Sequence, residues 1–108
     1  MNRKSLQIWI AALRSGKYKQ TTRQLFNREK TEFCCLGVAN EVLHCGIKSN
    51  SDSYYIIYDK LGIKRTDLKQ YGSRLVAMND AERKNFNEIA DYIEEVMLPL
   101  AEESACGN

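Results

Sequence analysis

Residues 17–23, Lys-Tyr-Lys-Gln-Thr-Thr-Arg, form the richest concentration of ligand-binding side chains in the sequence. Lysine and arginine attract phosphate, a tyrosine ring stacks on a base, and amide and hydroxyl groups supply hydrogen bonds. Such a set suits a nucleotide, a small anion or a nucleic-acid backbone. We therefore predict a site for a phosphorylated ligand that includes Tyr18, Lys19, Gln20 and Arg23. The alternative is a solvated loop with an ordinary surplus of positive charge.

A second polar pair, Asn79 and Asp80, follows the apolar residues 76–78. The Asp80 carboxylate is suited to accept hydrogen bonds from a ribose hydroxyl, and we expect this pair to complete the same ligand site. The alternative is a turn or a helix cap, because asparagine and aspartate side chains bond readily to the neighbouring backbone.

Cys34, Cys35 and His44 would support an enzymatic function, because a histidine can activate a cysteine thiolate. The alternative, which we favour, is that the two cysteines are small buried apolar residues. The four cysteines of the chain lack the paired spacing of a zinc site, and the isolated glycines form no phosphate-binding loop. We therefore predict no catalytic residue, no metal and no cofactor, and we expect reduced thiols.

Two amphipathic helices are expected to hold these groups in place. Apolar side chains recur with helical spacing near the N-terminus, which predicts a helix over about residues 4–15 with Trp9 on its buried face. Near the other end, Asn85 and Glu88 have the spacing of a capping box, and an apolar face follows them. This pattern predicts a final helix over about residues 85–97.

The middle of the chain is less regular. Residues 21–26 and 31–35 are rich in β-branched and aromatic side chains, which predicts a β-hairpin. A second helix follows the hairpin and is expected to end at Gly46. Residues 54–61 are expected to form a short helix, and residues 71–73 a turn.

These elements predict an α+β fold: a small helix-rich single domain over residues 1–108, with a β-hairpin packed beside the N- and C-terminal helices. Pro99 should end or kink the last helix, and the tail, residues 100–108, should fray. No segment approaches the ~18 apolar residues that span a bilayer, so we expect a cytoplasmic protein with no membrane partner.

The net charge of +2 hides an asymmetry between the two ends of the chain. Residues 1–30 carry eight lysines and arginines and one acid, whereas residues 79–108 carry eight acids and two bases. The two ends either match each other within the fold or leave a basic surface for an anionic partner.

Four segments resemble those of small uncharacterised proteins encoded by bacteriophages and prophages. They are residues 12–20 (ALRSGKYKQ), 33–38 (FCCLGV), 78–80 (MND) and 85–94 (NFNEIADYIE). In that family an LRSGxYxQ segment, a CCLGV segment, and an ND followed by FxEIADxI occur in the same order. The resemblance covers most of the chain except residues 47–70, and it implies a phage source more than an activity.

Small phage proteins without a catalytic constellation are often inhibitors of host defence. The resemblance and the basic stretch together suggest an anti-defence sponge in the host cytoplasm, one that sequesters a nucleotide-derived immune signal. The alternatives are an interaction protein that inhibits a host protein or nucleic-acid complex and, less favoured, a small enzyme; direct nucleic-acid binding is not favoured. We also expect a homodimer, because a nucleotide pocket is easier to build between two copies of so short a chain.

Overall fold

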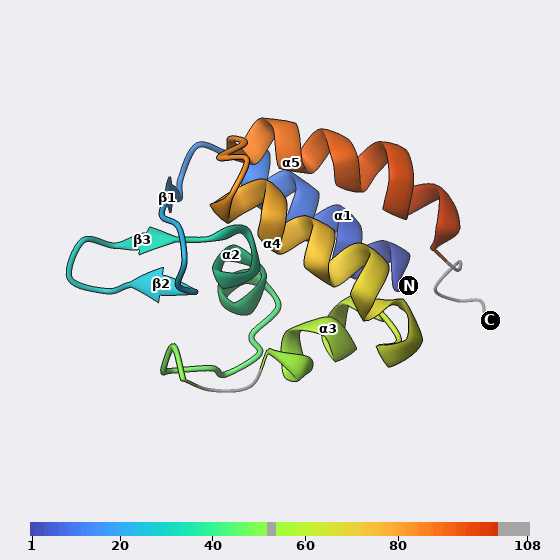
Figure 1. Cartoon of the computed structure of the whole chain (residues 1–108), viewed down its shortest axis with the longest axis horizontal. Helices are drawn as coiled ribbons and strands as arrows, with labels where there is room; N and C mark the ends of the chain where they lie inside the picture. Colours follow the sequence, from blue (N-terminus) through green and yellow to red (C-terminus); the bar gives the residue numbers. More distant parts are fainter. Residues whose placement is uncertain (52–53, 102–108) are drawn as a thin grey trace.

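The computed structural model describes residues 1–51 and 54–101, and its N-terminal helix is the one that the sequence predicts (Figure 1). Helix α1 (Arg3–Arg14) begins at Asn2, whose side chain accepts a hydrogen bond from the backbone N–H of Ser5. Trp9, at the centre of its apolar face, is fully buried. The predicted helix and the core position of this tryptophan are confirmed.

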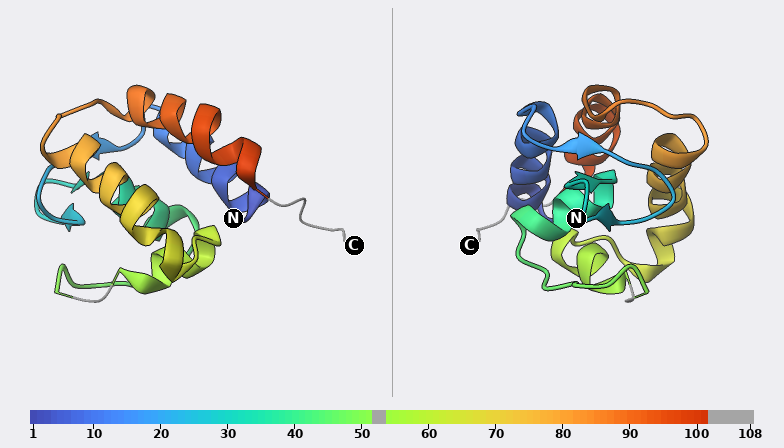
Figure 2. Two further views of the ribbon diagram at one scale, coloured as in Figure 1. Left: turned by 45° about the vertical axis from the view of Figure 1, so that its right-hand side comes forward. Right: turned by 90° about the vertical axis from the view of Figure 1, so that its left-hand side faces the viewer.

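The helix at the centre of the molecule is α2 (Cys35–Val42), whose first six residues are all buried. A helix buried on every side must be surrounded by other elements, and α2 contacts α1, α3 (Tyr55–Leu61) and α4 (Ser73–Asp80). The right-hand view of Figure 2 shows α1 and α4 on opposite sides of α2, with α3 beneath it. Gly37 lets the backbone of Leu25 approach α2 closely, because a Cβ there would lie 1.9 Å from the carbonyl oxygen of Leu25.

A small sheet lies at the end of the molecule where α2 begins (Figure 1). Its three strands are β1 (Lys19–Gln20), β2 (Phe26–Asn27) and β3 (Glu32–Phe33), in the order β1-β3-β2. Strands β2 and β3 are antiparallel neighbours, so the predicted hairpin is confirmed. The predicted extent of its first strand is wrong, because the paired residues begin only at Phe26. A parallel partner of β3, strand β1, stands on the other edge instead.

Residues 21–25 are not a strand because they carry the chain from one edge of β3 to the other. The N–H of Thr21 still donates to the carbonyl oxygen of Phe33, at 2.9 Å. Arg23 then adopts a left-handed conformation with φ 65°, which turns the chain. The turn brings Leu25 into the core, where it is fully buried, and burial of this side chain outweighs the continuation of a short strand.

The segment after α3 is helical where the sequence predicts a turn. A 3₁₀ turn, η1 (Arg65–Asp67), leads into a π-helical turn, η2 (Leu68–Gly72), which is continuous with α4. The predicted turn at residues 71–73 is therefore wrong, and α4 is a helix that was not predicted. Glycine is usually a sign of a break, but Gly72 lies within the helix, and the ring of Tyr58 packs directly against it, where a side chain would be crowded.

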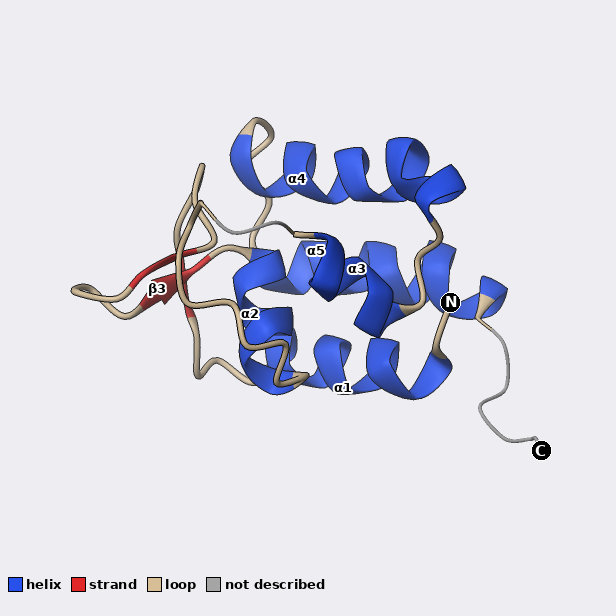
Figure 3. Cartoon of the chain, turned by 90° about the horizontal axis from the view of Figure 1, so that it is seen from below, coloured by secondary structure: helices blue, strands red, loops and turns tan. Residues whose placement is uncertain are grey.

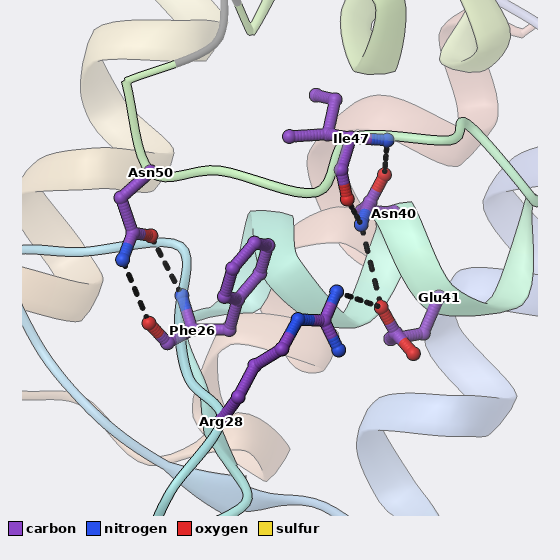
Figure 4. A network of polar contacts seen from close by, with 6 residues as sticks. All are labelled: Phe26, Arg28, Asn40, Glu41, Ile47 and Asn50. Atoms are coloured by element: carbon purple, nitrogen blue, oxygen red, sulfur yellow. Dashed lines mark hydrogen bonds and ion pairs between the residues drawn. The ribbon is translucent and has the colours of Figure 1, made fainter.

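The two helices in the middle of the chain differ in how well the sequence predicts their ends. The short helix expected over residues 54–61 is confirmed as α3. The predicted end of α2 at Gly46 is wrong, because the helix stops at Val42 and His44 already has a left-handed φ of 54°. The side-chain amide of Asn40 then bonds both backbone groups of Ile47 at 3.0 Å each (Figure 4).

The C-terminal helix confirms its predicted start. Helix α5 (Phe86–Tyr92) begins with a complete capping box between Asn85 and Glu88. It continues as a π-helical turn, η3 (Ile93–Met97), and ends in a 3₁₀ turn, η4 (Leu98–Leu100), which contains the proline. Of the tail expected to fray, residues 102–108 lie outside the described residues.

Helices α1 and α5 pack side by side through buried apolar faces (Figure 1). At their edge Arg14 pairs with Asp91 at 2.8 Å and with Glu94 at 3.0 Å. The basic and acidic ends of the chain therefore match each other at this arginine. The fold is α+β, a small helix-rich unit with its sheet at one end.

Trp9→Ala is expected to lower the free energy of unfolding by about 3–5 kcal/mol, as for other buried large aromatic side chains. The indole is fully buried, and its Nε1–H donates to the carbonyl oxygen of Cys35 at 2.8 Å. Urea denaturation of the wild type and the variant measures the loss. Trp9→Phe, which keeps most of the volume but not the donor, should cost less than the alanine variant. A cost below about 1 kcal/mol for Trp9→Ala would contradict the central position of this side chain in the core.

Candidate functional site

The side-chain amide of Asn79, at the end of α4, is 1% exposed and makes four hydrogen bonds. Its Oδ1 accepts from Nε2 of Gln20 at 2.9 Å and from the N–H of Cys35 at 3.2 Å. Its Nδ2 donates to the carbonyl oxygen of Thr21 at 2.9 Å and to Oδ1 of Asp80 at 2.8 Å. Four bonds are the full capacity of a side-chain amide. They tie α4 to the strand β1 and to the start of α2.

Neighbouring groups extend this network. The Nε2 of Gln20 also donates to the carbonyl oxygen of Lys84 at 2.8 Å. Oδ1 of Asp80 also accepts from the N–H of Arg23 at 2.9 Å, which holds the left-handed turn against α4. The structure thus brings together four of the six residues that the sequence analysis assigned to a ligand site. Two of the four, Gln20 and Asn79, use their amides inside the protein.

The other two residues of the predicted site lie apart from this network. Tyr18 is half-buried and packs edge-on against Phe33, with ring centroids 5.5 Å apart and planes at 86°. Lys19 is exposed on β1. Residues 17–23 therefore form one edge of the sheet and its turn, and their binding of a ligand stays a prediction.

A groove of about 730 Å³ lies between α3 and α4, and Asp80 stands at one end of it. Figure 3 shows from below the two helices that form its sides. One side carries three tyrosines, Tyr54, Tyr55 and Tyr58, and the other carries Val76. The surface of the groove is thus largely aromatic and aliphatic, with a carboxylate at its edge. Ligand pockets commonly combine an apolar lining with a few polar groups in this way.

Tyr58 is the most deeply placed of the three tyrosines, and it is 6% exposed. Its hydroxyl lies against Gly72, where an added Cβ would be 3.1 Å from the oxygen. Within the described residues this hydroxyl has no hydrogen-bond partner, so it can bond to a ligand. Burial raises the pKa of Tyr58, which keeps the hydroxyl protonated at neutral pH. The π-helical turn that ends at Gly72 is a form often found at functional sites.

Asp80 joins the groove to the hydrogen-bond network. The same residue lines the groove and a small cavity of about 20 Å³ beside it, which Gln24 and Cys34 also line. Its Oδ1 is held by two N–H donors of the protein. A carboxylate has two oxygens that each accept hydrogen bonds, so the side chain retains capacity for a ligand hydroxyl or amino group.

The two neighbouring cysteines have the properties of structural residues. Cys34 Sγ accepts the N–H of Gly37 at 3.4 Å and so caps the start of α2. Burial raises the pKa of the Cys34 thiol to about 11 and raises the pKa of Cys35 well above its ordinary value. Both thiols are therefore protonated at neutral pH, which does not favour a nucleophilic cysteine.

The sequence analysis did not identify the tyrosines as site residues. The available signal was their spacing, because Tyr54 and Tyr58 are four residues apart and share one face of a helix. A cation also stands close to this face, since the guanidinium of Arg65 lies over the ring of Tyr55 at 4.2 Å from its centroid.

Two kinds of feature are absent from residues 1–51 and 54–101. No three histidine, cysteine, aspartate or glutamate side chains of this part lie in a group that could hold a metal ion. None of the helices in the same part is long and apolar enough to cross a membrane.

A family model described as a domain of unknown function (DUF8296) matches residues 1–56, more than half of the chain. The chain belongs to this family. The matched part includes α1, the sheet and α2, whereas most of the groove is formed by residues that follow it. No curated protein and no solved structure matches the chain.

Asn79→Ala is expected to lower the free energy of unfolding by at least about 2 kcal/mol, because it leaves buried partners without hydrogen bonds. Asp80→Ala, at the half-buried neighbouring position, should cost less. Urea denaturation compares the two variants under the same conditions. Equal losses would contradict the assignment of Asn79 as the residue that ties α4 to the rest of the fold.

The thiols of Cys34 and Cys35 are expected to react with a disulfide reagent at pH 8 far more slowly than Cys45, which is less buried. The labelling is done in a Cys106→Ser variant, so that only these three thiols are counted. Fast labelling of native Cys34 would restore the nucleophile hypothesis.

The Cys34 thiol also makes stability depend on pH. It is protonated in the native state up to about pH 11, whereas the unfolded thiol ionises near pH 9. Its contribution to the free energy of unfolding is therefore complete below about pH 9 and falls as the pH rises toward 11.

Proposed function

We propose that this DUF8296 protein is a non-enzymatic binding protein that holds a small nucleoside-like ligand in the groove between α3 and α4. The observation that carries the proposal is the set of three tyrosines that face a groove ending at Asp80. Aromatic rings can stack on any of the nucleobases, because every base has a π face. The carboxylate of Asp80 then accepts hydrogen bonds from ribose hydroxyls, the role that the sequence analysis expected of it.

The size and chemistry of the groove support this choice of ligand. Its volume of about 730 Å³ falls within the range of pockets that bind small molecules and cofactors. The hydroxyl of Tyr58, which has no hydrogen-bond partner among the described residues, offers a hydrogen bond at the bottom of the groove, and Val76 offers an apolar wall. A flat ligand with a polar edge matches this arrangement better than a purely apolar one.

Binding without catalysis is supported by the groups that stand near the groove. The two cysteines are protonated at neutral pH, since burial raises their pKa values. The histidine, His44, is exposed after the end of α2 and does not line the groove. A ligand recovered chemically unchanged after incubation would distinguish a binding protein from an enzyme.

The resemblance to small phage proteins suggests the biological role of this binding. The protein would act as an anti-defence sponge in the host cytoplasm, where it sequesters a nucleotide-derived immune signal. One chain already provides a groove of sufficient volume, so binding does not require a second copy. The homodimer stays a prediction for light scattering.

One observation favours the second candidate, an inhibitor of a host protein. Tyr54, Tyr55 and Ile56 follow one another at the start of α3 and are 36%, 46% and 48% exposed. Consecutive exposed apolar side chains are a feature of protein interfaces. A nucleoside-free complex with a host protein, lost on Ile56→Ala, would favour this candidate.

Tyr54→Ala and Tyr58→Phe are expected to weaken binding of the best ligand from a panel of nucleosides and nucleotides, identified by thermal shift. Loss of one stacking contact costs about 1–3 kcal/mol, which is roughly a 5-fold to 150-fold loss of affinity for Tyr54→Ala. Tyr58→Phe removes only the hydroxyl and should weaken binding less. Calorimetric titration measures both effects.

Ile56→Ala is the matched control, because Ile56 lies on the same helix with similar exposure and does not line the groove. Its affinity should equal that of the wild type. Tyr18→Ala and Arg23→Ala test the site that the sequence predicts. If these two variants weaken binding while Tyr54→Ala does not, the ligand lies on the edge of the sheet and the groove is not its site.

A further inference from the structure

A polar hollow of about 410 Å³ adjoins the groove, and Asn50 lines both. Two cations, Arg28 and Lys48, face this hollow together with the amides of Gln24 and Asn27. Guanidinium, ammonium and amide N–H groups are the donors with which proteins bind phosphate. The sequence analysis assigned no function to these residues.

The two sides of the hollow are held together by a specific contact. The side-chain amide of Asn50 accepts the N–H of Phe26 at 3.1 Å and donates to its carbonyl oxygen at 2.9 Å (Figure 4). This pair of bonds replaces a neighbouring strand at the edge of β2. It therefore fixes the loop that carries Lys48 against the hairpin that carries Arg28.

Arg28 is held in place by its neighbours, but its guanidinium keeps N–H groups that can bind a ligand. Its guanidinium lies over the ring of Phe26, 4.2 Å from the centroid, and its side chain is 53% exposed. Its nearest carboxylate partner is Glu41, at an N–O distance of 3.7 Å (Figure 4). This distance is long for a charge-assisted hydrogen bond, which is usually 2.7–2.9 Å. Two carboxylates stand beside the two cations, since Glu29 lines the hollow and Glu41 pairs with Arg28, so an anionic ligand has to compete with these carboxylates for the cations.

Shared residues connect the hollow to the groove along two routes. Asn50 lines the groove and the hollow directly. Gln24 lines the hollow and the small cavity beside Asp80, which shares Tyr54 and Asp80 with the groove. A ligand whose base lies among the tyrosines can therefore direct a phosphate group into the hollow.

We infer that the hollow between Arg28 and Lys48 is a phosphate subsite, and that the ligand of the groove is a phosphorylated nucleoside rather than a free one. The inference rests on the proposed function for the position of the base. It moves the phosphate contacts from Lys19 and Arg23, where the sequence predicts them, to the opposite edge of the sheet. Arg23 instead lies at the turn beside Asp80.

The test compares the four ribonucleosides with their 5′-monophosphates, the dinucleotide pApA and inorganic pyrophosphate, by calorimetric titration at low salt. The wild type should bind at least one phosphorylated nucleoside ten or more times more tightly than the nucleoside alone. Arg28→Ala and Lys48→Ala should each remove most of that gain and leave nucleoside affinity unchanged. Glu41→Gln, which keeps an acceptor for Asn40, should increase the affinity for the phosphorylated probe. Lys30→Ala, on the turn of the same hairpin but outside the hollow, is the control and should have no effect.

The outcomes separate this inference from the proposed function. Equal affinity for nucleosides and their phosphates, with no effect of Arg28→Ala, would overturn the phosphate subsite and leave the groove as a nucleoside site. Pyrophosphate binding that needs Arg28 and Lys48, without any effect of Tyr54→Ala on any probe, would support the anion site and overturn the groove as the site of the base. Absence of binding to every probe would overturn both.

Discussion

The fold depends on one buried amide. Asn79 is the last but one residue of α4, and three of its four hydrogen bonds reach β1, the turn that follows β1 and the start of α2. No apolar contact could replace them, because the groups that they satisfy are polar backbone and side-chain atoms with little access to water. A buried amide with every donor and acceptor satisfied stabilises one arrangement of the segments around it, and partly satisfied alternatives are penalised. The position of Asp80, and with it one end of the groove, follows directly from this arrangement.

Two other asparagines use their side-chain amides to satisfy backbone groups at the loops. The Asn40 amide pairs with the backbone of Ile47, and the Asn50 amide pairs with the backbone of Phe26, so each side chain takes the place of a strand (Figure 4). The loop between α2 and α3 would otherwise leave polar backbone groups beside a hydrophobic core without partners. Its residues reach the groove and the polar hollow only because these two contacts position them.

The sequence predicts the parts of the fold that repeat with a regular period. Helices α1 and α5 each carry an apolar stripe and a cap, so Trp9 and the capping box at Asn85 could be identified without a structure. The parallel strand β1 could not, because two residues give no periodic pattern and the pairing depends on Asn79, which is distant in sequence. Helix α4 was missed because a glycine such as Gly72 usually indicates the end of a helix. Only the structure shows that the ring of Tyr58 occupies the space where a side chain would stand.

For the candidate site, the sequence predicts which polar residues lie close together, but it does not predict the groove between α3 and α4. It places Gln20 and Arg23 near Asn79 and Asp80, and the structure brings these four residues together. The role of the aromatic side chains depends on which helix faces which, and that information is tertiary: Tyr54 and Tyr58 become groove residues only when α4 packs opposite α3.

The proposed function and the phosphate subsite together require that the surface between α3 and α4 bind a phosphorylated nucleoside. The most direct measurement is a titration of ¹⁵N-labelled protein with the 5′-monophosphates, followed by two-dimensional NMR of the backbone amides. We expect the largest shifts at Tyr54, Tyr58, Gly72 and Asp80, with a second group at Arg28 and Lys48. Shifts confined to residues 17–19, or to the far side of α5, would contradict this expectation.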